Sequence, residues 1–590
     1  FKQKTAYEIP LRLVGSEMCI RDRYLLKVYI IMASKYIDIK TVKFFMNNVQ
    51  ELEKILDKER FVDYNIESVD LYIESVKKFA DRELFPYIKE MDEKPAHYKD
   101  GSIHVHQQVE KMMKEGGAMG LISAPFNYED GGLQLPLLVH TASNYILDAA
   151  NNHLPGYSGL TSGAAELIIE FASEELKEKY TPKMLTGEWG GTMCLTEPQA
   201  GSSLSDIVTK AKPDANNAYK ISGQKIFISG GDHQYAGNIV HLLLARIEGA
   251  PAGTKGISLF VVPKNRLNDN GELEANDVTT VADFEKMGQK GYCTTHLSFG
   301  DKGDCHGYLV GEENQGLNYM FLMMNGARIA VGRGASAIAC AAYYASLEYA
   351  NERPQGRKLS SDGTKNLKNK QSLIIEHPDV RRMLLLQKSM VEGSMNIIFK
   401  AAKYFDLQHN STDKKEKHKY ETLLEMIIPV VKTYPSEAGI YSINNGLQVL
   451  GGYGFCSDFI LQQYYRDIRI SSIYEGTTGI QSQDLLGRKM MLNNGEGAKL
   501  LLDEIKKTID VNFLGNVNCV KSVEAYFKNK KAGQISIVSS VAGYRGLPAA
   551  GAYCASKSAL SSFAESLYFD LKRDNVRVSL VSPGFIKTPM

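Results

Sequence analysis

The sequence predicts an α+β protein with several domains, and three observations support this prediction. The chain has 590 residues, which is too long for a single hydrophobic core. Apolar residues recur at helical spacing both before and after the middle of the chain. From about Trp189 the pattern changes to alternating or continuously apolar runs between turns rich in glycine and asparagine, which is typical of strands.

The individual elements follow from the same patterns. Helical spacing is clearest in two segments before the middle, and it returns in long segments from Tyr319 onward. In chain order, we expect helices at residues 69–80 and 163–172, strands at 219–229, 239–246 and 256–262, and long helices at 329–351, 377–405, 419–450 and 481–509.

The composition excludes several classes of function. Hydrophobic residues make up 44% and charged residues 23% of the chain, which is ordinary for a globular protein. A net charge of +1 gives no electrostatic reason to expect binding to nucleic acid or to an anionic membrane. The longest early apolar run, residues 24–32, contains Lys27 and is far shorter than the roughly 20 residues of a membrane span. We therefore expect no nucleic-acid partner and no membrane span.

The cysteines and histidines show no pattern typical of a metal site. The eight cysteines are scattered without a Cys-x-x-Cys pair, so structural zinc is not expected. This spacing fits free thiols in a reducing compartment, and we expect a cytoplasmic location. The only tight histidine pair, His104 and His106, is interpreted as part of a polar loop, and no metal is expected.

The first residues of the chain do not resemble a folded segment. Residues 1–23 show neither helical nor strand periodicity, and they are similar to the translated adapter sequence found at the ends of transcriptome-derived proteins. We therefore interpret residues 1–31 as a non-native leader and exclude them from fold reasoning. Met32 is then the expected biological start.

One glutamate, Glu475, lies in a short break rich in glycine and threonine between two apolar, helix-like segments. Such a break places a carboxylate in a crevice rather than on a solvated face. A glutamate there can be a general base, a partner in a helix N-cap or an ordinary surface charge. About two dozen positions earlier, residues 448–455 read Gln-Val-Leu-Gly-Gly-Tyr-Gly-Phe.

A second segment far upstream favours the catalytic interpretation of Glu475. Residues 193–202 read Met-Cys-Leu-Thr-Glu-Pro-Gln-Ala-Gly-Ser, and residues 474–477 read Tyr-Glu-Gly-Thr. Together the two segments resemble the paired signatures of the flavin-dependent acyl-CoA dehydrogenases. The resemblance covers about residues 32–509. An Arg-Pro-Gln-Gly-Arg run and an insert at 359–373 are similar to the large bacterial subgroup that includes methylthiopropanoyl-CoA dehydrogenases.

The resemblance implies an architecture and a reaction. It implies an N-terminal helical domain at 32–188, a central β-domain at 189–315 and a C-terminal helical bundle at 316–509. It also implies α,β-dehydrogenation of an acyl-CoA thioester, FAD as the cofactor and an electron-transfer flavoprotein as the acceptor. Because FAD contacts in the family span subunits, it implies a homodimer or homotetramer.

The resemblance further implies roles for individual residues. The α-proton of a thioester is far less acidic than a carboxylic acid, so a carboxylate base must be desolvated, and the thioester oxygen needs hydrogen-bond donors. Glu475 would be this base, with its own backbone N–H as one of the donors. The residues implied to bind FAD are Met193, Leu195, Thr196, Ser202, Phe227, Ser229, Arg353, Gln448, Gly451, Gly452, Gly476 and Thr477. Those implied to meet the acyl-CoA are Ser202, Asn325 and Arg328.

These residues also have ordinary structural interpretations. A threonine before Glu-Pro is commonly a cap or turn residue, an aromatic residue in an alternating strand is usually core, and an arginine often forms a surface ion pair. Four positions depart from the family pattern. Ser203 replaces Asp, Phe227 replaces Trp, Gln463 replaces Lys or Arg, and the loop at Arg353 lacks the common Phe before Gly. None of these changes removes the base or the flavin segment.

From residue 510 the sequence changes character again. Residues 534–540 and 576–581 are expected to be strands, with a helix opening at Tyr553 between them. This order resembles the second half of a short-chain dehydrogenase/reductase, so we expect a partial α/β, Rossmann-like fragment at 510–590. No Gly-x-Gly-x-x-Gly turn between a strand and a helix lies near the junction, and the relaxed match at 332–337 falls inside a helical run.

The tail nevertheless carries the four-residue pattern of that second family. Tyr553 and Lys557 have the spacing that places both on one helix face, where the ammonium lowers the pKa of the phenol. Ser540 and Asn512 precede them at matching intervals, so we interpret the four as a vestigial reductase tetrad. As an isolated fragment, the tail would expose a sheet edge and half a core, which favours disorder or aggregation.

Three hypotheses for function follow. The first is an FAD-dependent acyl-CoA dehydrogenase with foreign ends, that is, a chimeric sequence. The second is an NAD(P)-dependent short-chain reductase, against which the missing phosphate loop argues. The third is a catalytically silent acyl-CoA-binding homologue, against which Glu475 argues.

Overall fold

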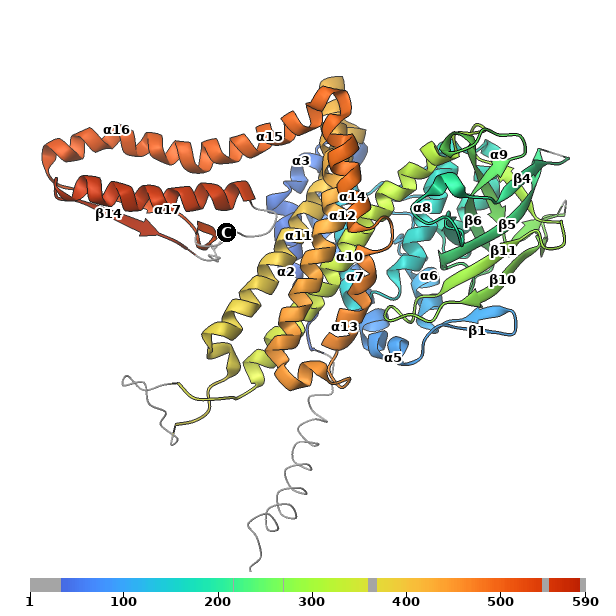
Figure 1. The fold of residues 1–590 in the computed structure, drawn as a ribbon, viewed down its shortest axis with the longest axis horizontal. Coiled ribbons are helices and arrows are strands. Elements are labelled where there is room, and N and C mark those ends of the chain that lie inside the picture. The colour runs from blue at the N-terminus through green and yellow to red at the C-terminus, as the bar shows by residue number, and fades with distance from the viewer. Residues whose placement is uncertain (1–32, 216, 269, 359–368, 544–550, 584–590) are drawn as a thin grey trace, which may run out of the picture.

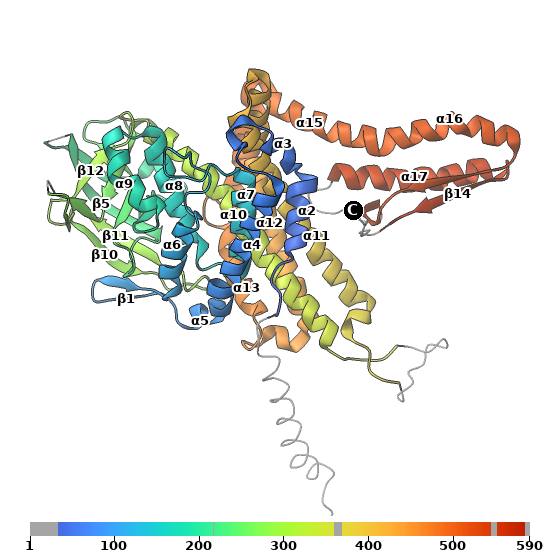
Figure 2. The ribbon, with the colours of Figure 1, turned by 180° about the vertical axis from the view of Figure 1, so that it is seen from behind.

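The computed structural model describes residues 33–215, 217–268, 270–358, 369–543 and 551–583. The predicted leader at 1–31 and most of the 359–373 insert lie outside these residues. Figures 1 and 2 show a β-rich part on one side, a central set of long helices, and an arm that projects from the other side. The predicted α+β multidomain fold is confirmed.

The N-terminal part is helical, as predicted. Its helices are α2 (Ile39–Phe44), α3 (Leu52–Leu56), α4 (Ile66–Phe79), α5 (Ile88–Glu93), α6 (Gln108–Ala118), α7 (Leu137–Ala150), α8 (Pro155–Phe171) and α9 (Glu174–Leu185). The two helices predicted in this part correspond to α4 and α8. A capping box formed by Asn65 and Ser68 begins α4, which satisfies backbone N–H groups that the first turn cannot pair.

A short antiparallel hairpin, β1 (His97–Lys99) and β2 (Ser102–His104), interrupts these helices. His104 pairs with His97 across it, and their rings stack with centroids 5.6 Å apart. The interpretation of His104 as part of a loop was therefore wrong, because cross-strand pairing places its side chain on a strand. Within the described residues, no group of side chains has the make-up of a metal site.

The central part is one mainly antiparallel sheet. Its strands are β3 (Gly190–Cys194), β4 (Lys210–Pro213), β5 (Ala218–Ser229), β6 (Ile239–Ile247), β7 (Ile257–Pro263), β10 (Val278–Asp283), β11 (Thr294–Phe299) and β12 (His306–Leu309), in the order β10-β11-β5-β12-β7-β6-β3, with β4 against β5 and β6. A small side hairpin consists of β8 (Asn265–Leu267) and β9 (Leu273–Ala275). The three predicted strands are β5, β6 and β7.

The C-terminal bundle is built on three long helices, α10 (Gly316–Glu352), α11 (Pro378–Asn410) and α12 (Lys414–Leu450), followed by the short α13 (Leu461–Ile468) and α14 (Thr478–Gln483) and then by α15 (Glu496–Ile509). The single helix predicted at 481–509 is wrong. Leu492, Asn493 and Asn494 are non-helical, and both asparagines have positive φ. Asparagine tolerates that conformation better than most residues, so the helical pattern continues through a break that spacing alone does not reveal.

The tail forms the projecting arm. Helix α15 continues through a π-helical turn into α16 (Gly515–Lys530), and β13 (Gly533–Val538), α17 (Gly551–Lys572) and β14 (Val576–Val581) follow. The two strands are parallel and in register from Gly533–Val576 to Val538–Val581. The predicted strands and helix are confirmed. Helices α16 and α17 cover this small sheet with apolar residues, and the expected disorder or aggregation of the isolated fragment stays a prediction.

Within the part of the chain that the structure describes, three hydrophobic cores hold these parts together. The largest joins the N-terminal helices, one face of the sheet and the bundle, the second fills the other side of the sheet, and the third lies within the tail. The first core therefore depends on segments that are hundreds of residues apart, whereas the third depends on residues from one short stretch. Within the described residues, no helix has both the length and the apolar character needed to cross a membrane.

Candidate active site

Glu475 lies in a tight turn between a 3₁₀ segment (Arg469–Ser472) and α14. Glu475 and Gly476 both have left-handed backbone conformations, with φ of 53° and 85°. This conformation is unfavourable for a residue with a Cβ, so the surrounding structure must hold it. Thr477, and not Glu475, is the N-cap of α14, since its side chain accepts from Ile480 N at 3.3 Å. The cap interpretation of Glu475 is therefore wrong.

Two side chains hold the carbonyl groups of this turn. Gln481 Nε2 donates to the carbonyl oxygen of Glu475 at 2.9 Å. Lys432 Nζ, from the middle of α12, donates to the carbonyl oxygen of Gly476 at 2.7 Å. Neither Gln481 nor Lys432 was predicted from the sequence, because both lie inside helical patterns where a polar residue is ordinary.

The electrostatic environment of Glu475 favours a base. Burial raises the pKa of its carboxyl group, while the charges of Arg328 and Lys432 act in the opposite direction. Desolvation makes a carboxylate a stronger base, and nearby cations keep a fraction of it ionised. An ordinary surface charge would show neither effect, so the solvated interpretation of Glu475 is not favoured.

The predicted substrate residues Asn325 and Arg328 lie near the N-terminal end of α10. Arg328 is buried, and one of its terminal nitrogens lies 3.2 Å from Asp484 and 3.3 Å from the side-chain oxygen of Asn325. Asn325 Nδ2 in turn donates to Glu425 at 3.3 Å. Arg328 thus forms an ion pair within the protein, and its Nε is buried without a partner among the described residues. Its role toward acyl-CoA stays a prediction.

The predicted flavin segment is fastened to a bulge in β5. The register between β5 and β11 shifts so that Ile226 and Phe227 lie opposite one residue of β11, and Phe227 has a φ of 57°. The bulge frees the N–H of Ile226, which donates to the carbonyl oxygen of Thr196 at 2.9 Å. Bulges next to active sites redirect side chains. Here the bulge brings Thr196 beside Phe227, and the flavin roles of these residues stay a prediction.

Phe227 is not a core residue. Its ring is 58% exposed and lies 4.5 Å, between centroids, from that of Phe284. The core interpretation was therefore wrong, since the bulge turns this side chain out of the sheet. An exposed aromatic ring beside the Thr196 segment is suited to cover a planar cofactor.

A buried ion pair supports the same segment from behind. Lys225 Nζ lies 2.8 Å from Glu197 Oε1 and donates to the carbonyl oxygen of Leu195 at 2.9 Å. Glu197 also accepts from the backbone N–H groups of Val208 and Thr209. Both charges are therefore satisfied although they are buried, as such groups require. No local pattern in the sequence reveals this pair, because the proximity of Lys225 and Glu197 depends on the strand pairing.

The remaining residues of the segment differ in exposure. Met193 and Thr196 are partly exposed, whereas Leu195 is buried. Ser202 lies in an exposed loop, and next to it Ser203 donates to Asp206 Oδ2 at 2.6 Å. The serine that replaces the family's aspartate thus closes a local turn through a different acid.

Tyr292 lies between the β5 wall and the Glu475 turn, and sequence reasoning missed it. Its ring packs edge-on against Tyr157 with centroids 4.6 Å apart. It also covers Gly156, where a Cβ would come within 2.6 Å of the ring. Burial raises the pKa of its hydroxyl group, and the charge of Glu475 adds a small contribution in the same direction. A tyrosine in a loop carries no pattern that reveals such a position.

Four of the predicted FAD residues meet at the opposite end of the bundle. Arg353, Gln448, Gly451 and Gly452 line one cavity of about 450 Å³ together with Tyr453. The Arg353 guanidinium lies 5.4 Å from the centroid of the Tyr453 ring. Apart from their chain neighbours, no atom of the described residues lies within 4 Å of where a Cβ would stand on either glycine. A cation beside open backbone is suited to a dinucleotide pyrophosphate, so these residues fit FAD.

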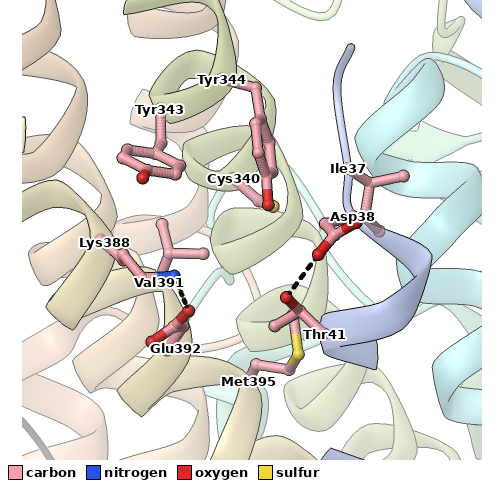
Figure 3. A pocket seen from close by; sticks show the side chains of 10 residues that line it. All are labelled: Ile37, Asp38, Thr41, Cys340, Tyr343, Tyr344, Lys388, Val391, Glu392 and Met395. Atoms are coloured by element: carbon pink, nitrogen blue, oxygen red, sulfur yellow. Dashed lines mark hydrogen bonds and ion pairs between the residues drawn. The ribbon is translucent and has the colours of Figure 1, made fainter. Parts of the chain in front are cut away.

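The two groups of predicted residues are far apart in one chain. Arg328 and Arg353 are separated by roughly 37 Å of α10, at 1.5 Å per residue. The Glu475 turn, held from the middle of α12, therefore lies well away from the Arg353 cavity at the C-terminal end of that helix. One further cavity, shown in Figure 3, lies where Asp38 and Thr41 meet Cys340 and Lys388. Its volume of about 10 Å³ holds at most one water, which excludes a substrate.

The reductase residues of the tail come together only in part. Lys557 Nζ lies 5.5 Å from the centroid of the Tyr553 ring and donates to the carbonyl oxygen of Val538. Asn512 donates instead to Thr508 within its own helix, and Ser540 accepts from the N–H of Ala542. The predicted helix-face pairing of Tyr553 and Lys557 is present, and the function of the four residues stays a prediction.

Comparison with known proteins gives the family. Residues 67–188, 192–302 and 359–490 match the N-terminal, middle and C-terminal domain models of acyl-CoA dehydrogenase, and residues 487–590 match the short chain dehydrogenase model. The chain belongs to the acyl-CoA dehydrogenase family, whose members are FAD-dependent oxidoreductases acting on CH–CH bonds. The tail match agrees with the chimeric sequence that was predicted.

Individual relatives cover most of the chain. A butyryl-CoA dehydrogenase of Syntrophomonas wolfei subsp. wolfei is 36% identical over 476 residues, which are 79% of this chain and 77% of the relative. A 3-methylmercaptopropionyl-CoA dehydrogenase of Ruegeria pomeroyi is 34% identical over 471 residues, 80% of this chain and 79% of the relative. The structure of butyryl-CoA dehydrogenase from Megasphaera elsdenii has a TM-score of 0.57 at 24% identity and covers 71% of this chain and 97% of that one.

Proposed function

We propose that the chain dehydrogenates an acyl-CoA thioester at its α and β carbons with Glu475 as the base. The observation that carries the proposal is the position of Glu475. Its desolvated carboxylate lies in a left-handed turn held at both carbonyl groups and faced by two cations. Such a carboxylate can remove the α-proton of a bound thioester.

The backbone of Glu475 suits the second requirement of this reaction, a donor for the thioester oxygen. Within the described part of the chain, the N–H of Glu475 donates to no backbone carbonyl, although those of Ile473 and Tyr474 do. This leaves it available for the charge that develops on the oxygen. Preorganised donors of this kind contribute strongly to acyl-group chemistry, so base and donor would come from one residue.

FAD, when bound, supplies the acceptor for the hydride from the β-carbon. The residues proposed to hold its flavin part are Met193, Leu195, Thr196, Ser202, Phe227, Ser229, Gly476 and Thr477. Arg353, Gln448, Gly451 and Gly452 are proposed to hold the adenosine part of a cofactor whose flavin lies in a neighbouring copy. The Arg353 cavity lies roughly 37 Å along α10 from Arg328, which faces Glu475, and this separation supports the division and hence a homodimer or homotetramer.

An electron-transfer flavoprotein is the proposed acceptor, and a cytoplasmic location is proposed from the free cysteines. The seven cysteines in the described residues form no disulfide with one another. The printed names of the two relatives suggest butyryl-CoA and 3-methylmercaptopropionyl-CoA as the first substrates to test.

The proposal is tested with the full chain. We expect the purified protein to be yellow and to bleach when butyryl-CoA or 3-methylmercaptopropionyl-CoA is added without oxygen. Glu475→Gln is expected to keep its FAD but not to bleach. If the flavin of Glu475→Gln were bleached by acyl-CoA at the rate of the unaltered protein, the assignment of Glu475 as the base would be contradicted. If the unaltered protein were colourless, the assignment of the FAD sites would be contradicted.

The two other hypotheses are less well supported. A short-chain reductase requires a phosphate loop, and in the described residues the tail sheet consists of β13 and β14 alone. A silent binding homologue gives no reason for a desolvated carboxylate in a held turn. Bleaching by acyl-CoA would exclude it directly.

A further inference from the structure

We propose that Lys432 is a positioning residue for Glu475. By holding the Gly476 carbonyl oxygen and facing the carboxylate with a positive charge, Lys432 fixes where the base points and keeps it ionised. This inference rests on the proposed role of Glu475.

The geometry of the turn supports the first part of this role. Lys432 is fully buried, and its ammonium reaches the carbonyl oxygen of Gly476 at 2.7 Å, while Gln481 holds the carbonyl oxygen of Glu475. A left-handed glutamate is unfavourable on its own and persists only where contacts fix it. Losing one of the two contacts would let the Glu475 peptide rotate and move its carboxylate away from the α-carbon.

Helix α12 is itself fixed at the position of Lys432. Pro435 has no N–H, so the carbonyl group of Val431 receives no helical hydrogen bond from it. Gly332 of α10 packs on this carbonyl so closely that a Cβ would come within 2.0 Å of the oxygen. Ser436 donates to the carbonyl oxygen of Lys432 at 2.7 Å. The stem of Lys432 therefore starts from a rigid contact between two helices, and Gly332 serves this contact rather than a phosphate loop.

The charges around Glu475 support the second part. The groups that face it are Arg328 from α10, Lys432 from α12, the adjacent Tyr474, and Tyr292 from the loop before β11. Arg328 is already paired with Asp484 at 3.2 Å. The hydrogen bond of Lys432 goes to an uncharged carbonyl group, so its charge is not cancelled by a carboxylate in contact.

Lys432 has a shifted pKa as well. Burial lowers the pKa of its ammonium to about 8, and the charges of Glu475 and Glu437 oppose this. The carboxylate of Glu475 must be ionised to accept a proton, so activity falls as the pH drops through its pKa. Because the charge of Lys432 lowers the pKa of Glu475, removing it raises that pKa and moves the acid limb of the rate to higher pH.

Three substitutions separate the hydrogen bond from the charge. Lys432→Met removes both, Lys432→Gln keeps a donor without charge, and Lys432→Arg keeps both. The rate of bleaching by butyryl-CoA is measured in a single turnover with the full chain across the acid range. Lys432→Met should be slower by roughly a hundredfold, as expected for a misplaced catalytic group, with its acid limb at higher pH. Lys432→Gln should restore the rate but leave the acid limb at higher pH. Lys432→Arg should restore both the rate and the position of the acid limb.

A lysine on the neighbouring helix provides a matched control. Lys400 on α11 is partly buried, and its ammonium lies 5.6 Å from the centroid of the Tyr404 ring, within α11. Lys400→Met should change neither the rate nor the acid limb. FAD content and melting temperature are recorded for every variant, so that a loss of folded protein is recognised.

Each outcome decides the inference. The inference would be overturned if Lys432→Met bleached at the unaltered rate with its acid limb at the unaltered pH. It would also be overturned if Lys432→Met bleached more slowly but kept its acid limb at the same pH and lost FAD to the same extent. If Glu475→Gln still bleaches, the proposed function fails first. If Glu475→Gln is inert while Lys432→Met behaves like the unaltered protein, only the role of Lys432 is lost.

Discussion

The main body and the C-terminal tail carry similar types of reactive residues, but they support them differently. In the body, Glu475 and the Thr196 segment are held by side chains from other elements, namely Lys432, Gln481 and Lys225. In the tail, the Asn512 side chain hydrogen-bonds within its own helix, and the core consists of residues from the tail itself. Distant segments thus fix the site in the body, whereas the described tail draws its core from one short stretch of the chain.

The largest expected effect separates the two regions by activity. Glu475→Gln should lower flavin reduction by about 10³- to 10⁴-fold, since general bases contribute up to this range. Tyr553→Phe in the tail should leave the same rate unchanged. Both variants are compared in anaerobic bleaching by acyl-CoA. A slower reaction in Tyr553→Phe would show that the tail takes part in the function of the body.

The next effect concerns the buried ion pair of the body. Lys225→Met leaves Glu197 buried without its counter-charge, which should lower the free energy of unfolding by about 3–5 kcal/mol. Lys220→Met on the same strand removes an exposed pair with Asp304 and should cost at most about 1 kcal/mol. Thermal unfolding followed by flavin release measures both. Equal losses for the two variants would contradict the role of burial.

A fall in pH should lower the stability of the body but not that of the tail. Burial lowers the pKa of His233 to about 4 and that of His241 to about 3, both from 6.5. A histidine with a lowered folded pKa stabilises fully above its unfolded pKa, and this stability is lost as the pH falls from 6.5 toward the folded pKa. Taking 1.36 kcal/mol for each pKa unit, the full loss is about 3 kcal/mol for His233 and about 5 kcal/mol for His241.

The tail offers the internal control for this acid effect. Residues 510–590 contain no histidine. The unfolding transition of the body should therefore move to lower temperature between neutral pH and pH 4 to 5, a range set by these histidines, while protection of the tail amides stays the same. An equal loss in both regions would assign the acid effect to carboxylates instead.

The smallest effect on the body should come from the tail core. Leu560 is fully buried there, so Leu560→Ala should cost the tail about 2–3 kcal/mol. The body should stay within about 0.5 kcal/mol, as for distant and independent sites. Hydrogen exchange of the amides in α17 measures the effect on the tail, and that of the amides in α12 measures the effect on the body. Faster exchange in α12 would show that the two cores are coupled.

Part of the site could be predicted from the sequence because it lies in continuous segments. The Tyr-Glu-Gly-Thr run pointed to Glu475 as the proposed base. The Gly-Gly run at 451–452 pointed to residues that line the Arg353 cavity. Lys432, Lys225 and Tyr292 could not be found in this way, because each is ordinary in its own segment. Their meaning depends on which backbone atoms another segment brings within reach.

The fold shows the same division. Periodicity located the strands and most helices, because one face of each is buried in a regular pattern. It failed at Asn493 and Asn494, where backbone conformation rather than hydrophobicity breaks the helix, and at His104, where strand pairing decides the structure.

The sequence by itself determined the class of fold, the family resemblance and the identity of the proposed base, since these depend on local patterns and short motifs. Only the tertiary structure decided which charges face Glu475, how the β5 bulge exposes Phe227, and that the Arg353 cavity lies far from Glu475. The physical reason is that burial, electrostatic environment and separation arise from contacts between segments distant in the chain, and no local pattern records them.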